Sequence, residues 1–441
     1  MTEPASLLEE IRFGYGPRSG WVLAPGGVDP DRVLAQLTAR DPGAEAWTGI
    51  DLATRQAALA DARRVKQGKP PLGPVLDLRP VARRDEVGFI ARPAAARLGF
   101  VERLVNLWAN RLTVSSVGGP ALFIPPYRDQ AIRPHVGGRF ADMLRASLWH
   151  PAMLSYLSQT SSIGPNSDLG RRKGRRLNEN LAREFLELHS MGSGYTQQDV
   201  TELARLLAGM KTDGTGRRMD PRAVEPGRKT ILGTRYGEGV HEIDRLVATV
   251  AARPETARSI AVMLARHFLD DTPPPDLVDE LAHIYLREDG QLPPIYRALL
   301  SHPAAQNPAL TKLRSPQEYM AATLRAVGLS GDPEQTPLFR KRETRLAEVM
   351  ARMGQPIFAA RRPDGWPETA TGWLTPPMLA SRLDWAADLA RLTGDRADPV
   401  AQTRAVLGDL ASPLLLSAVA GAEQRWEGLA VLLGSPEMMR R

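Results

Sequence analysis

The spacing of apolar residues is helical along most of the chain. Segments 241–271 and 315–328 repeat apolar residues three and four positions apart, which places them on one face of an α-helix. No series of short alternating segments predicts a sheet, and the pattern allows at most one small hairpin, in 212–240. The sequence therefore predicts an all-α fold, a multi-helix array in two or three packed sub-bundles.

Breaks rich in proline and glycine divide this helical pattern. We expect an N-terminal helical segment (1–98), a central helical core (99–211), an irregular insert (212–240), a second helical bundle (241–312) and a C-terminal helical segment (313–441). The last segment contains a long irregular loop with Trp366 and Trp373. Because aromatic-rich loops on a rigid scaffold often bind ligands, these tryptophans are candidates for lining a ligand groove. The alternative is a packed loop that they pin to the core.

The composition is that of an ordinary folded protein. The 441 residues are 43% hydrophobic and 24% charged, which is enough chain for two or three cores. Cysteine is absent, and this excludes disulfides, thiolate zinc sites and cysteine nucleophiles. The N-terminus lacks the pattern of a signal peptide, and no stretch approaches the ~18 apolar residues of a membrane span. We expect a soluble, cytoplasmic protein; the alternative is a periplasmic protein that is exported together with a partner.

The chain is basic, with a net charge of +7, and its one dense basic run is "GRRKGRR" at 170–176. Helix caps and apolar spacing are missing around this run, so we expect residues 165–176 to form an exposed loop. A phosphate-binding patch is the alternative. No aromatic residues interleave with the run, so stacking on single-stranded bases is not supported. Nucleic-acid binding therefore rests on net charge alone and is disfavoured.

A polar cluster lies on a helix that begins near residue 178. At about 100° per residue, Asn180, Glu184 and Glu187 share one side of this helix, whereas His189 falls on the apolar side. The residues that characterise this helix and the next are Asn178, Glu179, Asn180, Arg183, Glu184, Glu187, His189, Thr196 and Asp199. Thr196 is predicted to cap the second helix, with Asp199 as its reciprocal partner.

The cluster offers candidates for acid–base chemistry. Paired carboxylates can act as acid and base if their environments separate their pKa values. The catalytic candidates are Glu184, Glu187, Asn180, His150 and His189. One helix cannot present its two glutamates and His189 to a single ion, and the Glu-x-x-His spacing is convincing only at Glu280–His283. We therefore expect no metal and no cofactor.

Two helices are predicted to end in His-Pro, at His150 and His302. A histidine at a helix C-terminus interacts favourably with the helix dipole. We therefore expect each histidine to stabilise the helix that it ends.

The segment "NENLAREFLELHSMGSGYTQQDVTELARLLAGM" resembles the signature of the bacterial family called domain of unknown function 1800. The segments "RPHVGGRFADMLRASLWHPAMLSYL", "ARSIAVMLARHFLDDTPPPDLVDEL" and "KLRSPQEYMAATLRAVG" agree with it in order along the chain. The resemblance implies an all-helical fold and no established activity. It also implies a genomic neighbour of the exported alkaline-phosphatase/sulfatase-like class, which suggests shared work at the cell envelope.

The chain departs from the family pattern at polar positions. Arg111 and Val224 stand where the family usually has histidines, and Ser158 stands where it usually has an aspartate. These losses favour a non-catalytic helical partner or scaffold protein, working with a sulfatase-like envelope protein. The alternatives are a hydrolase that uses the Glu/Asn/His cluster, with His150 across a cleft, and a nucleic-acid-binding protein.

The resemblance leads to a prediction about burial. Solvated helix faces rarely form family signatures, so we expect the helix of Glu184 and Glu187 to be central, with both carboxylates buried and bonded to arginines or backbone N–H groups. Leu181, Phe185 and Leu188 should pack on the second helix. On this interpretation, Glu187→Ala would destabilise the fold by ~3 kcal/mol or more, because it would strand a buried partner.

Overall fold

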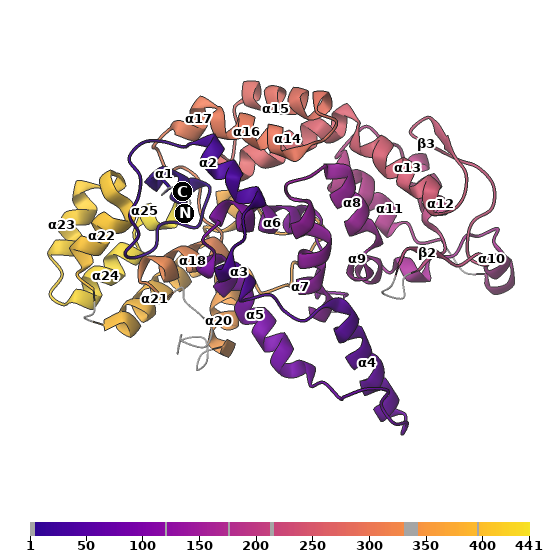
Figure 1. Cartoon of the computed structure of the whole chain (residues 1–441), viewed down its shortest axis with the longest axis horizontal. Helices are drawn as coiled ribbons and strands as arrows, with labels where there is room; N and C mark the ends of the chain where they lie inside the picture. Colours follow the sequence, from indigo (N-terminus) through magenta and orange to yellow (C-terminus); the bar gives the residue numbers. More distant parts are fainter. Residues whose placement is uncertain (1–4, 120, 175–176, 212–215, 330–342, 395–396) are drawn as a thin grey trace.

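A computed structural model describes residues 5–119, 121–174, 177–211, 216–329, 343–394 and 397–441. The fold is an all-α multi-helix array, as the spacing of apolar residues predicts, with only two two-stranded ladders among the described residues. The molecule is elongated and curved, with α22 to α25 at one end and α10 to α13 at the other (Figure 1). Among the described helices, none is long and apolar enough to cross a membrane.

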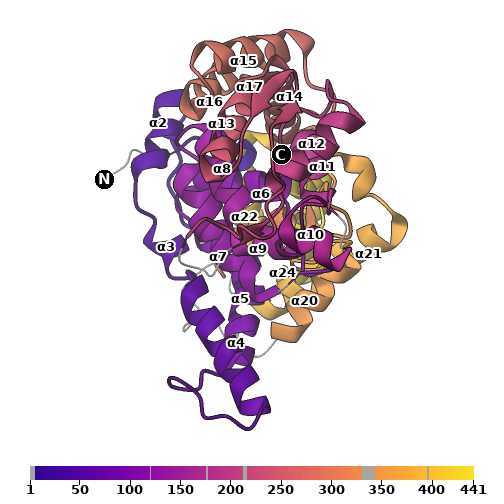
Figure 2. The same cartoon turned by 90° about the vertical axis from the view of Figure 1, so that its right-hand side faces the viewer.

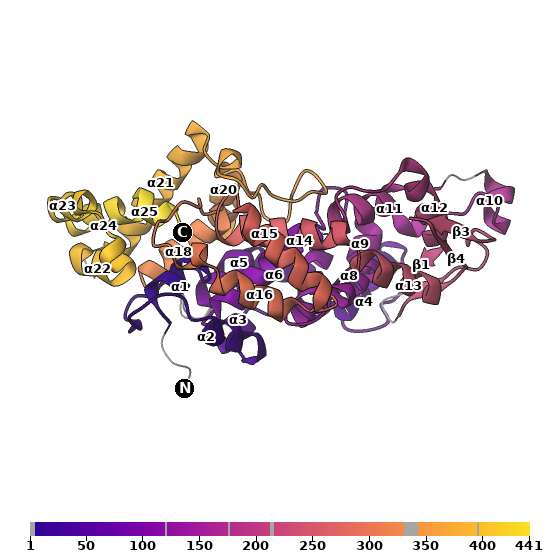
Figure 3. The same ribbon diagram turned by 90° about the horizontal axis from the view of Figure 1, so that it is seen from above.

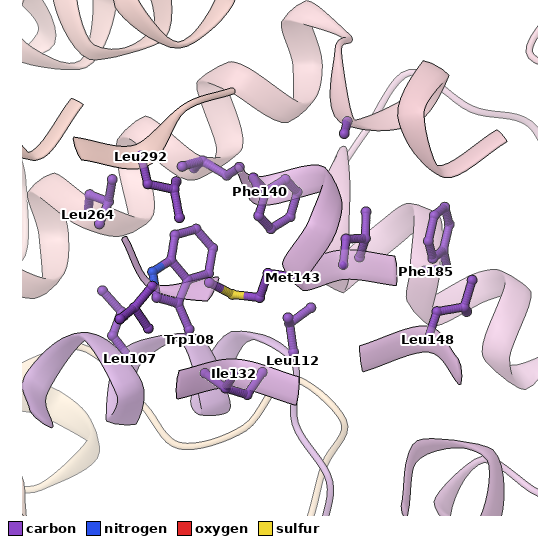
Figure 4. Close-up of a cluster of buried hydrophobic side chains, with 14 of the residues drawn as sticks. Leu107, Trp108, Leu112, Ile132, Phe140, Met143, Leu148, Phe185, Leu264 and Leu292 are labelled. Carbon is purple, nitrogen blue, oxygen red and sulfur yellow. The ribbon is translucent and has the colours of Figure 1, made fainter. Parts of the chain in front are cut away.

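The first of two hydrophobic cores is built mainly by residues 99–305. Its helices are α2 (Pro30–Ala35), α6 (Gly99–Arg111), α7 (Ile124–Tyr127), α8 (Phe140–Trp149), α9 (Pro151–Tyr156), α11 (Asn180–Glu184), α12 (Gln197–Leu207), α13 (Val240–Ala251), α14 (Pro254–Phe268), α15 (Pro275–Arg287), α16 (Leu292–Ser301) and α17 (Pro303–Gln306). Trp108 lies at the centre, where Phe140 and Met143 of α8 point toward its ring (Figure 4). Its indole N–H donates to the Tyr296 hydroxyl over 2.8 Å, which satisfies the one polar atom of this buried side chain.

The second core is built mainly by residues 313–439, together with two earlier helices. Its helices are α1 (Leu7–Arg12), α5 (Leu78–Ala95), α18 (Pro316–Ala326), α20 (Glu343–Arg352), α21 (Pro376–Thr393), α22 (Pro399–Leu407), α23 (Pro413–Ala420), α24 (Arg425–Leu433) and α25 (Pro436–Met439). All 11 residues of α18 are buried. Ser315 and Glu318 form a capping box at its start, so the N-terminal N–H groups of this enclosed helix have partners. The central helix of the protein is therefore α18.

Two short ladders lie next to the first core. Strand β3 (Lys229–Ile231) pairs with β4 (Thr234–Tyr236), and this is the hairpin that the sequence allows within the insert. Strand β1 (Met210–Lys211) pairs with β2 (Arg218–Met219) and joins the insert to the end of α12. The insert is thereby fixed to the helix that precedes it.

Among the described residues, three further helices lie outside the cores: α3 (Pro42–Glu45), α4 (Leu52–Lys66) and α10 (Asp168–Lys173). The hairpin of α4 and α5 projects as an arm from the body in both Figure 1 and Figure 2. A buried ion pair between Arg55 and Asp85 holds the two helices of the arm together. Residues of the N-terminal segment thus contribute to the arm and to both cores.

Candidate functional site

The polar side of the signature helix faces solvent. Asn180 and Glu187 are exposed, and Glu184 is only partly buried. The prediction of two buried carboxylates is therefore wrong. Helix α11 turns its apolar side toward α12, and the π-helical segment η6 (Phe185–Ser190) that continues it packs against α13 and α14, as the amphipathic pattern alone indicates for a surface helix. Burial raises the pKa of Glu184, and the charge of Glu187 adds to this, while Arg183 opposes it.

The apolar side of this helix packs largely as expected. Leu181 and Phe185 are buried in the first core with Val200, Leu203 and Leu207 of α12. Leu188 is only partly buried. This packing stabilises the pair of helices in the usual way for amphipathic surface helices.

The other signature residues fasten this helix pair together. Asn178 donates through its side-chain amide to the carbonyl of Leu157 over 2.8 Å. Glu179 accepts hydrogen bonds from Thr201 over 2.7 Å and Gln197 over 3.0 Å, and it lies 3.3 Å from Arg183. These contacts join the start of α11 to α12 and to the end of α9.

The cap of α12 is the one that the sequence predicts. Thr196 and Asp199 form a reciprocal capping box. Asp199 also accepts the backbone N–H of Leu232 over 2.6 Å, so the same carboxylate holds the β3–β4 hairpin against α12. Two signature residues therefore have structural partners.

The candidate histidines lie apart from the two glutamates. His150 accepts the backbone N–H of Ala152 at Nδ1 over 3.1 Å and so caps α9. His189 is buried on the apolar side of its helix. Among the described residues, no hydrogen bond or ion pair joins either histidine to Glu184 or Glu187. The structure does not assemble these candidates into one site.

Both His-Pro histidines act on the helix that follows them, not on the one that they end. His302 accepts the N–H of Ala304 over 3.2 Å, as His150 does for Ala152. The accepting Nδ1 of a capping imidazole carries no proton, so the contact that the structure shows for each ring is a cap of the following helix. Burial lowers the pKa of His150 to about 4, in agreement with a neutral ring.

The basic run is partly helical. Ser167 accepts the N–H of Gly170 and caps α10, so the prediction of a loop over 165–176 is wrong for the described part. The missed signal is Ser167 itself, which stands directly before the helix. Arg171 and Arg172 are exposed as expected, and residues 175–176 lie outside the described residues.

A cavity with both apolar and charged walls lies between the two cores, away from the signature helix. Its volume is about 90 Å³. Its charged and amide-bearing walls are Arg103, Asn106, Asn110, Arg128, His267, Lys312, Gln317, Glu318, Gln355, Glu368 and Arg441. These residues come from α6, η3 (Arg128–Ile132), α14, the segment between α17 and α18, α18 itself, the loop between α20 and α21, and the last residue of the sequence. The cavity therefore depends on how the two cores meet.

Glu318 is the centre of an ion cluster in the cavity wall. Arg103 donates to its Oε1 over 2.5 Å, and a guanidinium nitrogen of Arg441 lies 3.2 Å from the same oxygen. Burial raises the pKa of Glu318, but the two arginines lower it more, so the pKa is well below its ordinary range. The carboxylate is charged, and two buried cations share it.

His267 forms a second polar pair in the wall. Its Nδ1 lies 2.7 Å from Oε2 of Glu368, and its Nε2 lies 3.3 Å from Nη2 of Arg103. A guanidinium only donates hydrogen bonds, so Nε2 of His267 accepts one from Arg103. The ring proton is then on Nδ1, which donates a hydrogen bond to the Glu368 carboxylate. Burial lowers the pKa of His267 even though Glu368 opposes this. Both ring nitrogens are therefore occupied by groups of the protein.

The tryptophan loop separates this cavity from an open cleft. Trp366 and Trp373 line both spaces, with ring centroids 6.3 Å apart. Asn110 holds the loop by accepting the Trp366 N–H over 2.7 Å and by donating to the Trp366 carbonyl over 3.0 Å. Gly365 has φ +78°, and a Cβ there would lie 2.4 Å from the Asn110 side chain, so only glycine fits. Trp373 is buried, and the loop between α20 and α21 is visible in Figure 3.

The cleft has a volume of about 1580 Å³ and is rich in arginine. Its walls carry six arginines, Arg111, Arg258, Arg266, Arg352, Arg361 and Arg362, against three carboxylates, Glu255, Asp364 and Glu368. Arg111 lies partly buried in the cleft wall and donates to the Ser190 carbonyl and to the Ser259 hydroxyl. Arg361 and Arg362 are exposed. The cleft is thus suited to an anionic ligand.

Comparison with known proteins gives a family and no activity. Residues 10–440 match the family described as protein of unknown function DUF1800. The chain belongs to this family. No curated protein and no solved structure matches it.

Two residues at or directly beside positions where this DUF1800 chain departs from the expected pattern have defined surroundings. Arg111 borders the cleft. Glu225 is buried in the insert, where it accepts hydrogen bonds from the Asn166 side chain over 2.6 Å and from Arg205 over 3.1 Å. In the described part of the chain, no group of three His, Asp or Glu side chains could hold a metal ion.

The cavity residues of this DUF1800 chain were not predicted as a site. One signal was present in the sequence: Glu318 and Arg325 interrupt an otherwise apolar helix, and such residues are buried only when they are paired. Their partners could not be identified, because Arg103 and Arg441 lie far from Glu318 along the chain.

Proposed function

We propose that this DUF1800 protein is a non-catalytic binding protein whose cleft receives an acidic segment of a partner protein. The excess of arginines over carboxylates in the open cleft is the observation that carries this proposal. Guanidinium groups bind carboxylates through two parallel hydrogen bonds, which gives both affinity and orientation. Trp366, which is partly exposed, adds apolar surface beside these charges.

Arg111, Arg361 and Arg362 are three cleft arginines that an acidic segment could reach. Within the described residues, Arg111 forms no ion pair, and its two hydrogen bonds go to neutral oxygens. Arg362 contacts only Asp364, over 3.3 Å, and both side chains are largely solvent-exposed. An exposed pair of this kind contributes little stability, so an incoming carboxylate can compete for it.

The surroundings of the titratable groups favour binding over acid–base catalysis. His267 contacts Glu368, a residue of the cleft wall, but its two nitrogens face Glu368 and Arg103. A general base must reach the proton that it removes from a substrate, and this ring has no nitrogen left for that. The hydrolase alternative rests on Glu184, whose raised pKa would suit an acid.

The nature of the partner follows from the family resemblance alone. It suggests an exported protein of the sulfatase-like class, in which case this protein would work at the cell envelope. A cytoplasmic partner with an acidic segment would satisfy the same cleft. Either partner must present several carboxylates within the length of the cleft.

The proposal is tested by charge reversal in the cleft. A fluorescent decamer of glutamate should bind the wild-type protein, measured by fluorescence anisotropy at ~50 mM salt. The double variant Arg361→Glu, Arg362→Glu should bind at least tenfold more weakly, because two attractive contacts become repulsive. The matched control is Arg171→Glu, Arg172→Glu on α10, which changes the net charge equally on another exposed surface.

The outcomes separate three kinds of binding: an acidic segment in the cleft, attraction by net charge alone, and nucleic acid. Loss of binding in the cleft variant alone supports the proposal, whereas equal loss in both variants shows that only net charge matters. Absence of peptide binding by the wild-type protein contradicts the proposal that the cleft receives an acidic segment. A single-stranded DNA oligonucleotide that binds more tightly than the peptide, with a steep salt dependence, would favour the nucleic-acid alternative.

A further inference from the structure

We propose that the cavity between the two cores is a binding site for a small anion, the carboxylate or phosphate group of a small molecule. This goes beyond the docking of a protein segment in the cleft. The two spaces share the walls formed by Asn110, Trp366 and Glu368, but the cavity has its own set of charges.

The cavity wall carries more positive than negative charge. The cations that line it are Arg103, Arg128, Lys312 and Arg441, and the anions are Glu318 and Glu368. Two nearby side chains, Asp271 and Arg314, have opposite charges, so including them leaves the surplus at two positive side-chain charges. A buried surplus of charge is unfavourable unless a counter-charge enters. A small anion in the cavity supplies that charge.

Arg128 is the cation with the least compensation. In the described part of the chain it makes no hydrogen bond and no ion pair; its guanidinium lies 5.3 Å from the centroid of the Phe89 ring. The nearest carboxylates, on Glu102 and Asp129, are already held by Arg133, over 2.6 and 3.1 Å. Arg128 can therefore give its donors to a ligand without breaking any bond inside the protein.

Other polar atoms at the wall also have no partner. Nη1 of Arg441 and Nε of Arg103 are buried donors without an acceptor, although both side chains are otherwise paired with Glu318. Oδ1 of Asn106 is a buried acceptor without a donor. Buried polar atoms usually have a partner, and three of the fifteen side-chain atoms without one in the described part of the chain are on residues that line this cavity. Donors from Arg441 and Arg103 suit the oxygens of an anion, and Asn106 suits a hydroxyl of that ligand or a water.

The size of the cavity fits a small head group. One water needs roughly 15 Å³ measured in this way, so 90 Å³ holds several waters or one carboxylate or phosphate group. Burial lowers the pKa of Arg103 and of Arg128 to about 10. These lowered values agree with a cavity wall in which carboxylates do not fully balance the positive charge.

Inorganic phosphate and acetate are the probes for this site. Thermal unfolding of the full chain is followed at pH 7, with sodium chloride added so that the ionic strength is constant. A ligand that binds only the folded state raises Tm in proportion to the logarithm of its concentration once the site fills. We expect a rise of ~3 °C or more with at least one probe and no rise with chloride alone.

Asn106→Asp is the decisive variant. Aspartate has the shape of asparagine and adds a fixed negative charge at the cavity wall, where it takes the place of the ligand. Its Tm should exceed that of the wild type without any probe, and phosphate or acetate should raise it no further. Arg128→Gln removes the least compensated cation, so its Tm should be equal or higher and its response to the probe should fall by at least half.

Two controls make the result specific. Arg171→Gln lowers the net charge equally on exposed α10 and should respond to the probe like the wild type. The cleft variant Arg361→Glu, Arg362→Glu should also keep the response, which separates failure of this site from failure of the cleft. The proposal is wrong if neither probe stabilises the wild type, if all variants respond equally, or if Asn106→Asp lowers Tm.

Discussion

Arg103 of α6 and Glu318 of α18 form an ion pair 2.5 Å long across the boundary between the two cores, and both side chains are buried. Arg441 reaches the same carboxylate from the last residue of the sequence. One buried anion thus joins three segments that are distant in the chain. This contact links the packing of the cores to the shape of the cavity beside it.

We expect Glu318→Gln to destabilise the protein by roughly 3–5 kcal/mol. The amide has nearly the shape of the carboxylate, but it leaves Arg103 and Arg441 buried without a counter-charge, which is the costly way to break a buried pair. Urea unfolding followed by circular dichroism measures the change in the free energy of unfolding.

Glu187→Gln is the matched control. Glu187 is exposed and accepts a single hydrogen bond, from the Tyr195 hydroxyl over 3.0 Å. Its substitution should therefore change the free energy of unfolding by less than ~0.5 kcal/mol. The structure thus predicts a small change in stability at Glu187, whereas the family signature led us to expect a large one. Equal stability of Glu318→Gln and the wild type would show that the ion pair does not hold the cores together.

The comparison of α11 with α18 shows what the sequence could and could not predict. The pattern around Glu184 and Glu187 predicts an amphipathic surface helix, and the structure has one; the family signature pointed to burial and was misleading. A buried polar seam does exist, but it lies on α18, where Glu318 and Arg325 are fully enclosed. Periodicity assigns residues to the faces of a helix, but it does not reveal whether a second layer covers the polar face.

Local signals were more informative than long-range ones. The capping box of Thr196 follows from residues three positions apart, and helix ends before Pro151 and Pro303 follow from the steric effect of proline. The cavity residues are united only by the folded chain, since Asn106 and Glu368 come from different cores. No spacing rule brings such positions together.

The capping role of His150 leads to a prediction about pH. Burial lowers its pKa from 6.5 to about 4, so between these pH values the unfolded chain binds a proton that the folded protein does not. The stabilisation is therefore fully present above pH 6.5 and is lost as the pH falls toward 4. At ~1.4 kcal/mol per pKa unit, this group contributes roughly 3 kcal/mol to the loss.

His150→Asn should reduce that pH dependence. Asparagine can accept the Ala152 N–H as a helix cap but does not titrate, so stability at pH 7 should change by less than ~1 kcal/mol. The drop in unfolding free energy between pH 7 and pH 4.5 should become smaller by ~2 kcal/mol. Removing an exposed imidazole with His283→Asn controls for the loss of histidine as such. An unchanged pH profile of His150→Asn would contradict the buried, neutral ring.

We also expect the purified protein to carry no stoichiometric metal. Cysteine is absent, and the Glu280–His283 pair is exposed on α15 without a third ligand among the described residues. Elemental analysis of protein purified without chelator should give much less than one zinc, iron or manganese per chain. Treatment with EDTA should leave Tm unchanged within ~1 °C. One bound ion per chain, or a loss of stability in EDTA, would refute this expectation.

The arm formed by α4 and α5 should unfold locally when its turn is disrupted. Asp61 is buried, and its carboxylate accepts the backbone N–H of Leu72 over 2.7 Å and that of Gly73 over 3.2 Å. The turn itself is exposed, with the Leu72 side chain 80% accessible, so few apolar contacts support it. Segments with few buried contacts open with a free energy far below that of global unfolding.

We therefore expect Asp61→Ala to accelerate hydrogen exchange at Leu72 and Gly73 by at least tenfold, while the global free energy of unfolding changes by less than ~1 kcal/mol. Hydrogen exchange followed by mass spectrometry or NMR measures the first quantity, and urea unfolding measures the second. Asp61→Asn keeps one accepting oxygen and should restore protection of one of the two amides. Arg55→Gln breaks the buried pair with Asp85 and should loosen both helices of the arm, not only the turn. If Asp61→Ala lowers global stability as much as it lowers protection of the turn, the arm is not an independent unit but part of the cooperative fold.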